Sequence, residues 1–526
     1  MNVLRSSRRP LVFVVMAVIF ILATARPFTD SDFWWHLKTG QYIFETSSIP
    51  HTDIFSSLRF GSEWITHEWL SEVFMYSVFR KLGYGGLLVV FSIVITAAFW
   101  IAYQRCRQLA GHPYVSGFAV LLGAAATIPI WGVRPQMFSL LLASIFISFL
   151  DRYSRREETP SIWWLAPLMI LWVNLHAGFA LGLVLIMLTI AGLLLDWLLL
   201  RKDSFADVWR RVRRLCWLLL ICVAAVCLNP NGVRMYSYPL ETLFSRSMMQ
   251  YIEEWKSPDF HDASFQALAL LILATFSALA LSNRRARPGQ LLLLAATAWA
   301  ALRSYRNGPF FALVAMPLLA EHSWNWLTSQ RWGRWLSAPE KSGAVRMKLV
   351  LNVSLVGIIL AVSVLAVRRA VAMQPASESQ ELPAAAVDFI LAERPPQPIY
   401  NEYGWGGYLI WRLYPDYRVY IDGRADVYGD KLVEEFLEAR DGKPNWREPL
   451  ENHGIRTVLI KPDAALASLL REDSSWQKVF EDKQAVIFVR RVKQSTVDSQ
   501  QSTVNSRQST VHSRQSTVDG PQATVF

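Results

Sequence analysis

Two carboxylates and a histidine lie close together in one short stretch of the sequence. Asp30 and Asp32 are two positions apart, and two tryptophans and His36 follow them directly. A carboxylate can take a proton from a hydroxyl group or bind a divalent metal ion. Either aspartate is therefore a candidate base or metal ligand, or each takes one of these roles. The non-catalytic alternative is that Asp30 caps a helix that begins near Ser31 and that Asp32 stabilises its first turn.

A second polar group follows in the same segment of the chain. It contains Asp53, Glu63, His67 and Glu68, with tryptophans interspersed. These side chains, together with His36, are candidates for binding a substrate. The alternative is that His67 and Glu68 occupy the solvated face of a helix, and that the tryptophans anchor this segment at a membrane surface.

The composition indicates a protein with several membrane spans. Of its 526 residues, 52% are hydrophobic and only 18% are charged, which is more apolar than a soluble domain usually is. The net charge of +11 comes from Lys and Arg in short links between apolar runs, so it does not indicate nucleic-acid binding. The four cysteines lie in or beside apolar runs and predict no disulfide framework.

Eleven apolar runs predict about 11 transmembrane helices in a membrane domain covering residues 1–370. The first, Leu11 to Ala25, also resembles a signal peptide, but the many later spans favour a retained anchor. A long first loop, residues 26–84, then separates it from the others, and Phe33 to Phe44 and His67 to Leu82 have the spacing of interfacial helices. The remaining runs are Gly85 to Tyr103, Tyr114 to Trp131, Gln136 to Leu150, Ile162 to Trp172, Phe179 to Leu200, Leu215 to Leu228, Phe265 to Leu281, Leu291 to Leu302, Pro309 to Ala320 and Leu349 to Val367.

The distribution of basic residues predicts the orientation. Alternate links are rich in arginine, and basic links lie preferentially in the cytoplasm. The sequence therefore predicts a cytoplasmic N-terminus, with the first loop and the region after the last span on the outside. The residues of the predicted inside links include Arg105, Arg107, Arg152, Arg155, Arg156, Arg210, Arg211, Arg284, Arg285, Arg287, Arg331 and Arg334.

Three arginines depart from this rule. Arg134, Arg303 and Arg306 lie on the predicted outer side, where basic residues are disfavoured. A guanidinium group suits phosphate because it donates two parallel hydrogen bonds, so these arginines are candidate phosphate ligands. The alternative is an ion pair with a loop carboxylate such as Glu253 or Glu254.

Asn174 and His176 interrupt apolar sequence on the same predicted side. They are also candidates for binding a substrate. The alternative is a hydrogen-bonded histidine at the end of a helix.

The chain becomes mixed in composition from residue 374 to residue 493, which predicts a small α/β domain outside the membrane. No nucleotide-binding loop is present there, because Gly404 to Gly407 lacks the spacing and the Lys of such loops. Residues 494–526 repeat every seven residues with one apolar residue per unit, which predicts a disordered tail and not a coiled coil. The predicted strands are Pro398 to Asn401, Arg418 to Ile421, Thr457 to Ile460 and Ala485 to Val489, and the predicted helices are Ala384 to Ala392, Lys431 to Ala439 and Ala464 to Leu470.

Several motifs together resemble the bacterial GT-C-type integral membrane glycosyltransferases, in a branch without characterised members. The resemblance covers about residues 10–490 and omits the repeat tail. It rests on Asp30 to His36, Pro50 to Asp53, Glu63 to Glu72, Arg134 to Gln136, Trp172 to His176, Asn229 to Gly232 and Tyr420 to Arg424.

The resemblance implies a GT-C-like α-helical fold in the bacterial cytoplasmic membrane and transfer of a sugar from a polyprenyl-phosphate donor. An acidic residue of the first loop acts as base in that superfamily, which points to Asp30 or Asp32 without deciding between them. The acceptor would be a glycan, a lipid or a protein. Asp30 and Asp32 are also the candidate ligands of a divalent metal ion. No oligosaccharyltransferase-type Trp-Trp-Asp signature follows the last span, which argues against protein N-glycosylation.

The main alternative is a non-catalytic membrane protein of surface-polysaccharide assembly, either a flippase or a scaffold. A flippase needs a polar route through the membrane, whereas charged residues are scarce within the predicted spans and candidate site residues gather at one face. A third alternative is an inactive relative that binds glycolipid with the same fold. The distribution of charges favours chemistry at a membrane face.

Overall fold

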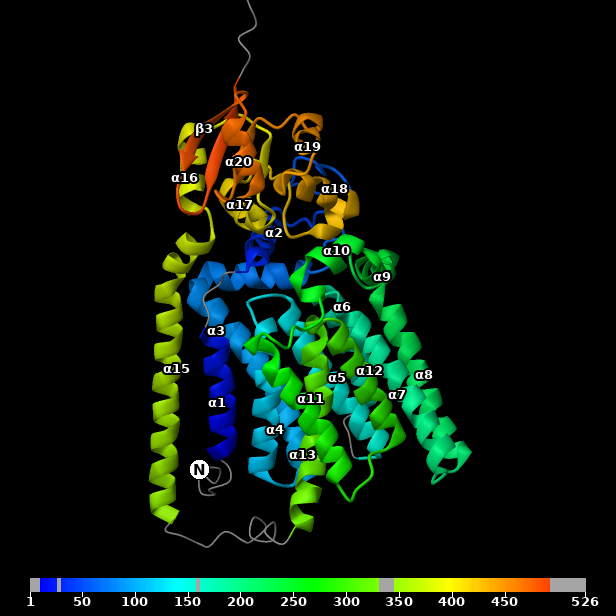
Figure 1. Ribbon diagram of the computed structural model, residues 1–526. Helices are drawn as coiled ribbons and strands as arrows, with labels where there is room; N and C mark the ends of the chain where they lie inside the picture. The colour runs from blue at the N-terminus through cyan, green and yellow to red at the C-terminus, as the bar shows by residue number, and fades with distance from the viewer. Residues whose placement is uncertain (1–9, 26–29, 158–160, 331–344, 492–526) are drawn as a thin grey trace, which may run out of the picture.

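The computed structural model describes residues 10–25, 30–157, 161–330 and 345–491. Figure 1 shows a bundle of helices with a small mixed domain at one end, formed by the C-terminal part of the chain. The predicted repeat tail lies outside the described residues, as does most of the last basic link.

Each of the eleven predicted apolar runs falls on a helix, because a chain in lipid must satisfy its backbone polar groups internally. Among the described residues, five helices are long and apolar enough to cross a membrane, and three shorter ones are also apolar. The count of 11 spans therefore stays a prediction. The helices are α1 (Pro10–Thr24), α3 (Trp69–Ala110), α4 (Pro113–Ala125), α5 (Gln136–Arg155), α6 (Leu165–Leu175), α7 (Phe179–Leu200), α8 (Phe205–Val226), α11 (Ala263–Leu281), α12 (Pro288–Arg303), α13 (Gly308–Ser329) and α15 (Val345–Glu381).

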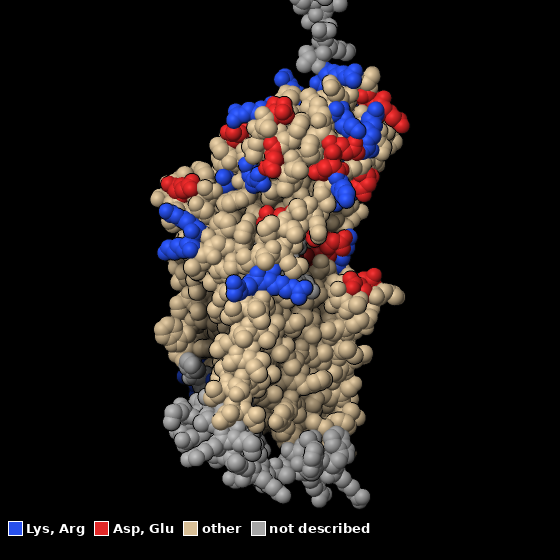
Figure 2. Space-filling model, turned by 90° about the vertical axis from the view of Figure 1, so that its left-hand side faces the viewer, with Lys and Arg blue, Asp and Glu red and all other residues tan. Residues whose placement is uncertain are grey.

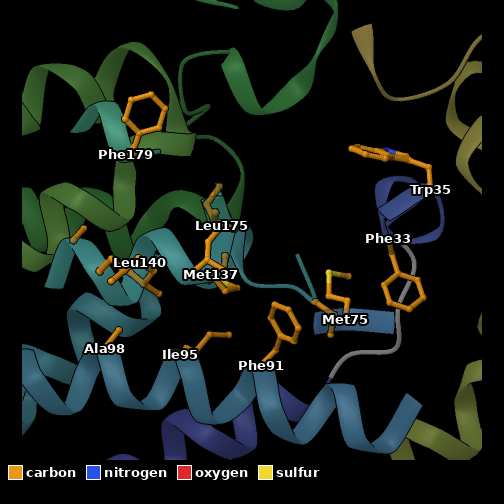
Figure 3. Packing of buried hydrophobic residues seen from close by; sticks show 14 of the residues in the cluster. Phe33, Trp35, Met75, Phe91, Ile95, Ala98, Met137, Leu140, Leu175 and Phe179 are labelled. Atoms are coloured by element: carbon orange, nitrogen blue, oxygen red, sulfur yellow. The ribbon is translucent and has the colours of Figure 1, made fainter. Parts of the chain in front are cut away.

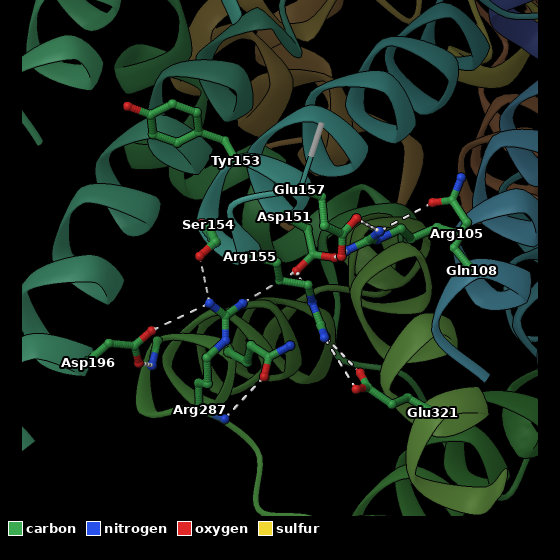
Figure 4. A network of polar contacts seen from close by, with 12 residues as sticks. Arg105, Gln108, Asp151, Tyr153, Ser154, Arg155, Glu157, Asp196, Arg287 and Glu321 are labelled. Carbon is green, nitrogen blue, oxygen red and sulfur yellow. Dashed lines mark hydrogen bonds and ion pairs between the residues drawn. The ribbon is translucent and has the colours of Figure 1, made fainter. Parts of the chain in front are cut away.

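A network of ion pairs joins the ends of four of these helices (Figure 4). Arg105 at the end of α3 contacts Asp151 of α5 at 2.5 Å, and Arg155 of α5 contacts Glu321 of α13 at 2.7 Å. Arg287, next to the start of α12, donates to the backbone carbonyl of Ser154 at 2.7 Å. Three links predicted to lie on the same side of the membrane therefore meet at one end of the bundle.

At the other end, two helical segments lie between the bundle and the C-terminal domain (Figure 1). The first is α2 (Ser31–Thr46), close to the predicted 33–44. The second is the first part of α3, which the sequence predicts as a separate helix. Gly83 joins it to the spanning part, and its positive φ of 62° breaks the helical path there, so that one continuous element changes direction.

The C-terminal domain contains one four-stranded sheet in the order β1-β2-β4-β3. Strands β1 and β2 are parallel, and the other neighbours are antiparallel. The elements are α16 (Ala384–Glu393), β1 (Ile399–Asn401), α17 (Gly406–Leu413), α18 (Ala425–Arg440), α19 (Arg447–Asn452), β2 (Thr457–Ile460), α20 (Ala465–Glu472), β3 (Trp476–Glu481) and β4 (Val486–Arg490).

The predicted strand Arg418 to Ile421 is wrong. This apolar stretch is buried, but it pairs with no strand of the sheet, and Val419 instead forms an isolated bridge with Ser56 of the first loop. Strand β3 was not predicted, because most of its side chains are exposed and it lacks the apolar run of a buried strand.

The hydrophobic core is continuous from the bundle into the segments above it. Figure 3 shows Phe33 and Trp35 of α2 near Met75 of α3, with Phe91 of α3 and Met137 of α5 further into the bundle. On the face seen in Figure 2, charged residues lie over the C-terminal domain and the adjoining end of the bundle, and a broad belt without them lies below. The bundle thus presents an apolar surface of the kind that faces lipid.

Candidate active site

Asp30 caps helix α2, as the non-catalytic alternative predicts. Its Oδ1 accepts a hydrogen bond from the backbone N–H of Asp32 at 2.9 Å, and its backbone is extended. Asp32 lies in the first turn, where its Oδ1 accepts from Nε1 of Trp35 at 3.2 Å. The cap fixes the direction of both carboxylates at the start of the helix.

Arg134 places one guanidinium group among three carboxylates. It lies in the turn between a short 3-10 helix (Ile128–Ile130) and α5. Its Nε is 2.6 Å from Oδ2 of Asp30, its Nη2 is 2.9 Å from Oδ2 of Asp32, and its Nη1 contacts Glu254. The ion pair with Glu254, which was the alternative to a phosphate-binding role, is present in the structure. We call Asp30, Asp32, Arg134 and Glu254 the carboxylate–arginine cluster.

The other two outer arginines differ in their distance from this cluster. Nη1 of Arg306 is 3.9 Å from Oε2 of Glu254, so Arg306 adjoins the cluster. Arg303 is exposed, and its guanidinium lies over the ring of Trp299 at 5.8 Å. The geometry therefore makes Arg306 a better candidate than Arg303 for a shared ligand with Arg134.

The environment of Asp32 raises its proton affinity. Burial and the neighbouring charge of Asp30 raise the pKa of Asp32 to about 7, although Arg134 opposes the shift. A carboxyl group that titrates near neutral pH suits a general base, because the ionised form is present and still basic.

A pocket of about 410 Å³ opens beside the cluster. Asp30 and Arg134 lie on its wall together with apolar side chains that include Leu22 of α1 and Leu88, Phe91 and Ile95 of α3. A pocket with charged groups at one place and apolar walls elsewhere has the character needed to hold a phosphate attached to a lipid chain.

Glu68 forms the centre of a second cluster, and we call Glu68, His36, His67, Glu72 and His176 the histidine–glutamate cluster. Oε1 of Glu68 is 3.4 Å from Nε2 of His67 and 3.3 Å from Nε2 of His176, and its Oε2 is 3.4 Å from Nδ1 of His36. The alternative of a solvated helix face is therefore wrong for Glu68, which is buried. Glu72 lies four residues after Glu68, the N-cap residue of α3, and no binding or catalytic role was predicted for it from the sequence.

The pKa values of the groups in this second cluster are shifted in different directions. Burial opposes ionisation of Glu68, but His67 and His36 hold its pKa below the usual value. Burial lowers the pKa of His36 and of His176 to about 3 each, and it raises the pKa of Glu72 well above the usual range. Near neutral pH, His36 and His176 are thus uncharged.

The remaining predicted residues lie outside both clusters. Asp53 is buried and binds Arg424 of the C-terminal domain, with Nη1 of Arg424 2.8 Å from its Oδ1. Glu63 contacts Arg234 at the surface. Oδ1 of Asn174 accepts from Nε1 of Trp69 at 2.8 Å, and its Nδ2 donates to backbone carbonyls, so its polar atoms bind within the protein.

The C-terminal domain contacts the carboxylate–arginine cluster through Gly423. No role at the site was predicted for this residue from the sequence. A Cβ atom at this position would overlap Oδ1 of Asp32. The adjacent Arg424 also binds Asp422, with Nε and Nη2 at 2.8 and 2.7 Å from its two oxygens. The domain is therefore part of the wall around Asp32.

A search of solved structures finds chains of similar fold. The apo oligosaccharyltransferase of Archaeoglobus fulgidus aligns with a TM-score of 0.50 at 11% identity, over 85% of this chain and 69% of that chain. Its oligosaccharyltransferase AglB, in complex with an inhibitory peptide and a dolichol-phosphate, gives 0.51 at 9% identity, over 93% and 75%. ArnT from Cupriavidus metallidurans bound to undecaprenyl phosphate gives 0.47 at 15% identity, over 92% and 98%.

A scan of protein-family models finds no match to the sequence, and a search of curated proteins finds none. At such low identities a structural similarity shows the fold alone. The evidence for the fold comes from the two oligosaccharyltransferase structures. The chain has a GT-C-type fold, and the GT-C-like fold predicted from the sequence motifs is confirmed.

We expect Arg424→Met to separate the C-terminal domain from the first loop. The change leaves Asp53 and Asp422 buried without a cation, which typically costs about 3–5 kcal/mol. The apparent melting temperature of the purified protein should fall by several degrees, and proteolysis between the two parts should become faster. Arg412→Met is the matched control, because Arg412 pairs with the exposed Asp388 and such pairs contribute less than about 1 kcal/mol. Equal melting temperatures for the two variants would contradict the docking role of Arg424.

Proposed function

We propose that this protein is a membrane glycosyltransferase that transfers a sugar from a polyprenyl-phosphate donor to an acceptor outside the cytoplasm. The observation that carries the proposal is the carboxylate–arginine cluster beside an apolar-walled pocket, at the end of a GT-C-type bundle. The dolichol-phosphate bound to the oligosaccharyltransferase of similar fold supports a polyprenyl carrier. The acceptor is a glycan, a lipid or a protein.

The donor enters from the apolar side of the pocket in this proposal. Its lipid chain contacts the side chains of α1 and α3, and its phosphate reaches Arg134 and Arg306. Because Arg134 already contacts three carboxylates, the phosphate replaces Glu254 as one of its partners. A divalent cation held by Asp30 and Asp32 is a second way to balance the phosphate charge.

Asp32 takes the proton of the acceptor hydroxyl in this proposal, and Asp30 positions it. Asp30 uses Oδ1 for the helix cap, whereas the pKa of Asp32 near 7 suits a base. Gly423 packs against Asp32, so in this proposal the acceptor reaches Asp32 beside the C-terminal domain. Glu68, which His67 and His176 also contact, supports this end of α2 through its contact with His36.

The proposal places the protein in the bacterial cytoplasmic membrane with the N-terminus inside. The ends of α3, α5 and α13 that form the network of Figure 4 then face the cytoplasm, which agrees with the preference for basic residues there. The carboxylate–arginine cluster and the C-terminal domain face the outside.

With a polyprenyl-phosphate sugar as donor, Asp32→Asn should lower the transfer rate by about 10²- to 10⁴-fold, because the amide cannot accept the proton. Asp30→Asn should have a smaller effect, since Asn caps a helix nearly as well as Asp. The assay measures labelled sugar transferred by purified protein, and donor binding is measured alongside to show that the site is intact. Undiminished transfer by both variants and by the double variant would exclude this cluster as the catalytic centre and favour the flippase or scaffold.

The transfer rate should rise with pH through an inflection near 7. A base must be ionised to act, and the ionised fraction of Asp32 grows as the pH passes its raised pKa. The inflection should disappear from the residual activity of Asp32→Asn and persist in Asp30→Asn at a lower pH, because the Asp30 charge contributes to the shift. A flat profile between pH 5 and pH 9 in the parent protein would contradict the assignment of Asp32.

Arg134→Lys should lower both donor affinity and transfer rate. Lysine keeps the charge but loses the planar group that contacts Asp30, Asp32 and Glu254 at once. Arg303→Lys is the matched control, because its guanidinium is exposed and lies over Trp299. Donor binding measured with a labelled polyprenyl-phosphate sugar should fall at least about tenfold for Arg134→Lys and stay near the parent value for Arg303→Lys. The reverse order would move the phosphate site to Arg303.

A further inference from the structure

The histidine–glutamate cluster contains three potential metal ligands that converge below α2. His36, Glu68 and Glu72 each offer one ligand atom, and these atoms all lie within 4.8 Å of one another. Nδ1 of His36 is 3.1 Å from Oε1 of Glu72 and 3.4 Å from Oε2 of Glu68. Metal–ligand bonds of about 2.0–2.2 Å place neighbouring ligand atoms roughly 3 Å apart, so these spacings fit one coordination sphere.

Glu72 gives an independent indication that a partner belongs here. Its side chain is only 1% exposed, and its Oε2 has no hydrogen-bond partner among the described residues. A buried polar atom without a partner is unfavourable and calls for an explanation such as an ion. Two carboxyl groups also face the same nitrogen of His36, which carries at most one hydrogen to donate.

The other two histidines orient Glu68 for this role. Nδ1 of His176 accepts the backbone N–H of Gly178 at 2.8 Å, so in the neutral ring the proton is on Nε2, which faces Oε1 of Glu68 at 3.3 Å. Nε2 of His67 faces the same oxygen. Hydrogen bonds to the outer oxygen of a ligating carboxylate fix its direction and leave the other oxygen for the metal.

We propose that His36, Glu68 and Glu72 bind one divalent transition-metal ion, with Zn²⁺ fitting the donor set best. One imidazole nitrogen and two carboxylates suit Zn²⁺ or Mn²⁺, whereas Ca²⁺ takes six to eight oxygen ligands. The site is separate from Asp30 and Asp32, although His36 follows Asp32 by one helical turn. The ion joins α2 to α3 below the carboxylate–arginine cluster and holds the start of α2 in place. This proposal does not depend on the transferase function.

The test uses the full chain purified in detergent, treated with EDTA and then incubated with Zn²⁺ as the probe. After desalting, mass spectrometry of the metal content should give about one Zn²⁺ per chain, and Zn²⁺ should raise the apparent melting temperature. His36→Gln and Glu72→Gln should each weaken Zn²⁺ affinity by more than about 100-fold. His67→Gln should weaken it by about 10- to 100-fold, because His67 contacts the outer oxygen of Glu68 and is not itself a ligand. His261→Gln is the control, because His261 is fully exposed beside Asp259.

A parent protein that binds no Zn²⁺ at millimolar concentration would overturn the proposal, and so would Zn²⁺ binding unchanged in both His36→Gln and Glu72→Gln. Binding lost only in Asp30→Asn or Asp32→Asn would assign the ion to the aspartates instead. Should the ligand variants not fold, Co²⁺ added to the parent decides the question. Absorption bands of low-symmetry Co²⁺ should then appear in the visible range and disappear on addition of equimolar Zn²⁺, and their absence would exclude the site.

Discussion

The start of α2 depends on the charge balance around Arg134. One guanidinium contacts carboxylates from two distant parts of the chain, the cap and first turn of α2 and the segment of Glu254 before α11. In a partly buried place each of these charges needs the others, because an isolated one would lose its hydration without compensation. The cluster therefore fixes the first loop to the outer end of the bundle. It also brings Asp30 and Arg134 to the wall of the pocket.

The C-terminal domain encloses the same helix from the other side. Gly423 lies against Asp32, and Arg424 is buried between Asp53 of the first loop and Asp422 of its own domain. The exposed fractions of the Arg424 and Asp53 side chains are 1% and 0%, so the pair is dry and its geometry is closely defined. The site is thus built by the bundle, the first loop and the domain together, which accounts for the position of the domain directly over α2.

Patterns that depend on neighbouring residues were predictable from the sequence, and contacts between distant residues were not. The eleven apolar runs lie on helices, and the aspartate cap of α2 is present, because both follow from local physics. The partners of Glu68 come from three segments, and no local pattern places His176 beside it. Residues 418–421 were predicted to form a strand because most of them are apolar. Their backbone instead pairs with the first loop, and local sequence does not determine which partner a segment pairs with.

The middle layer of the bundle contains long helical stretches without charge, which limits the functions that the molecule can perform. No charged residue occurs from Leu82 to Gln104 in α3, from Gln136 to Leu150 in α5 or from Gly308 to Ala320 in α13. The carboxylate–arginine cluster lies at one end of these helices, and the ion pairs of Figure 4 lie at the other. Moving a charged headgroup through this layer would remove its hydration without offering it a charged partner on the way. A reaction at one face needs no such passage, because the lipid chain of a lipid-linked substrate can stay in the apolar layer.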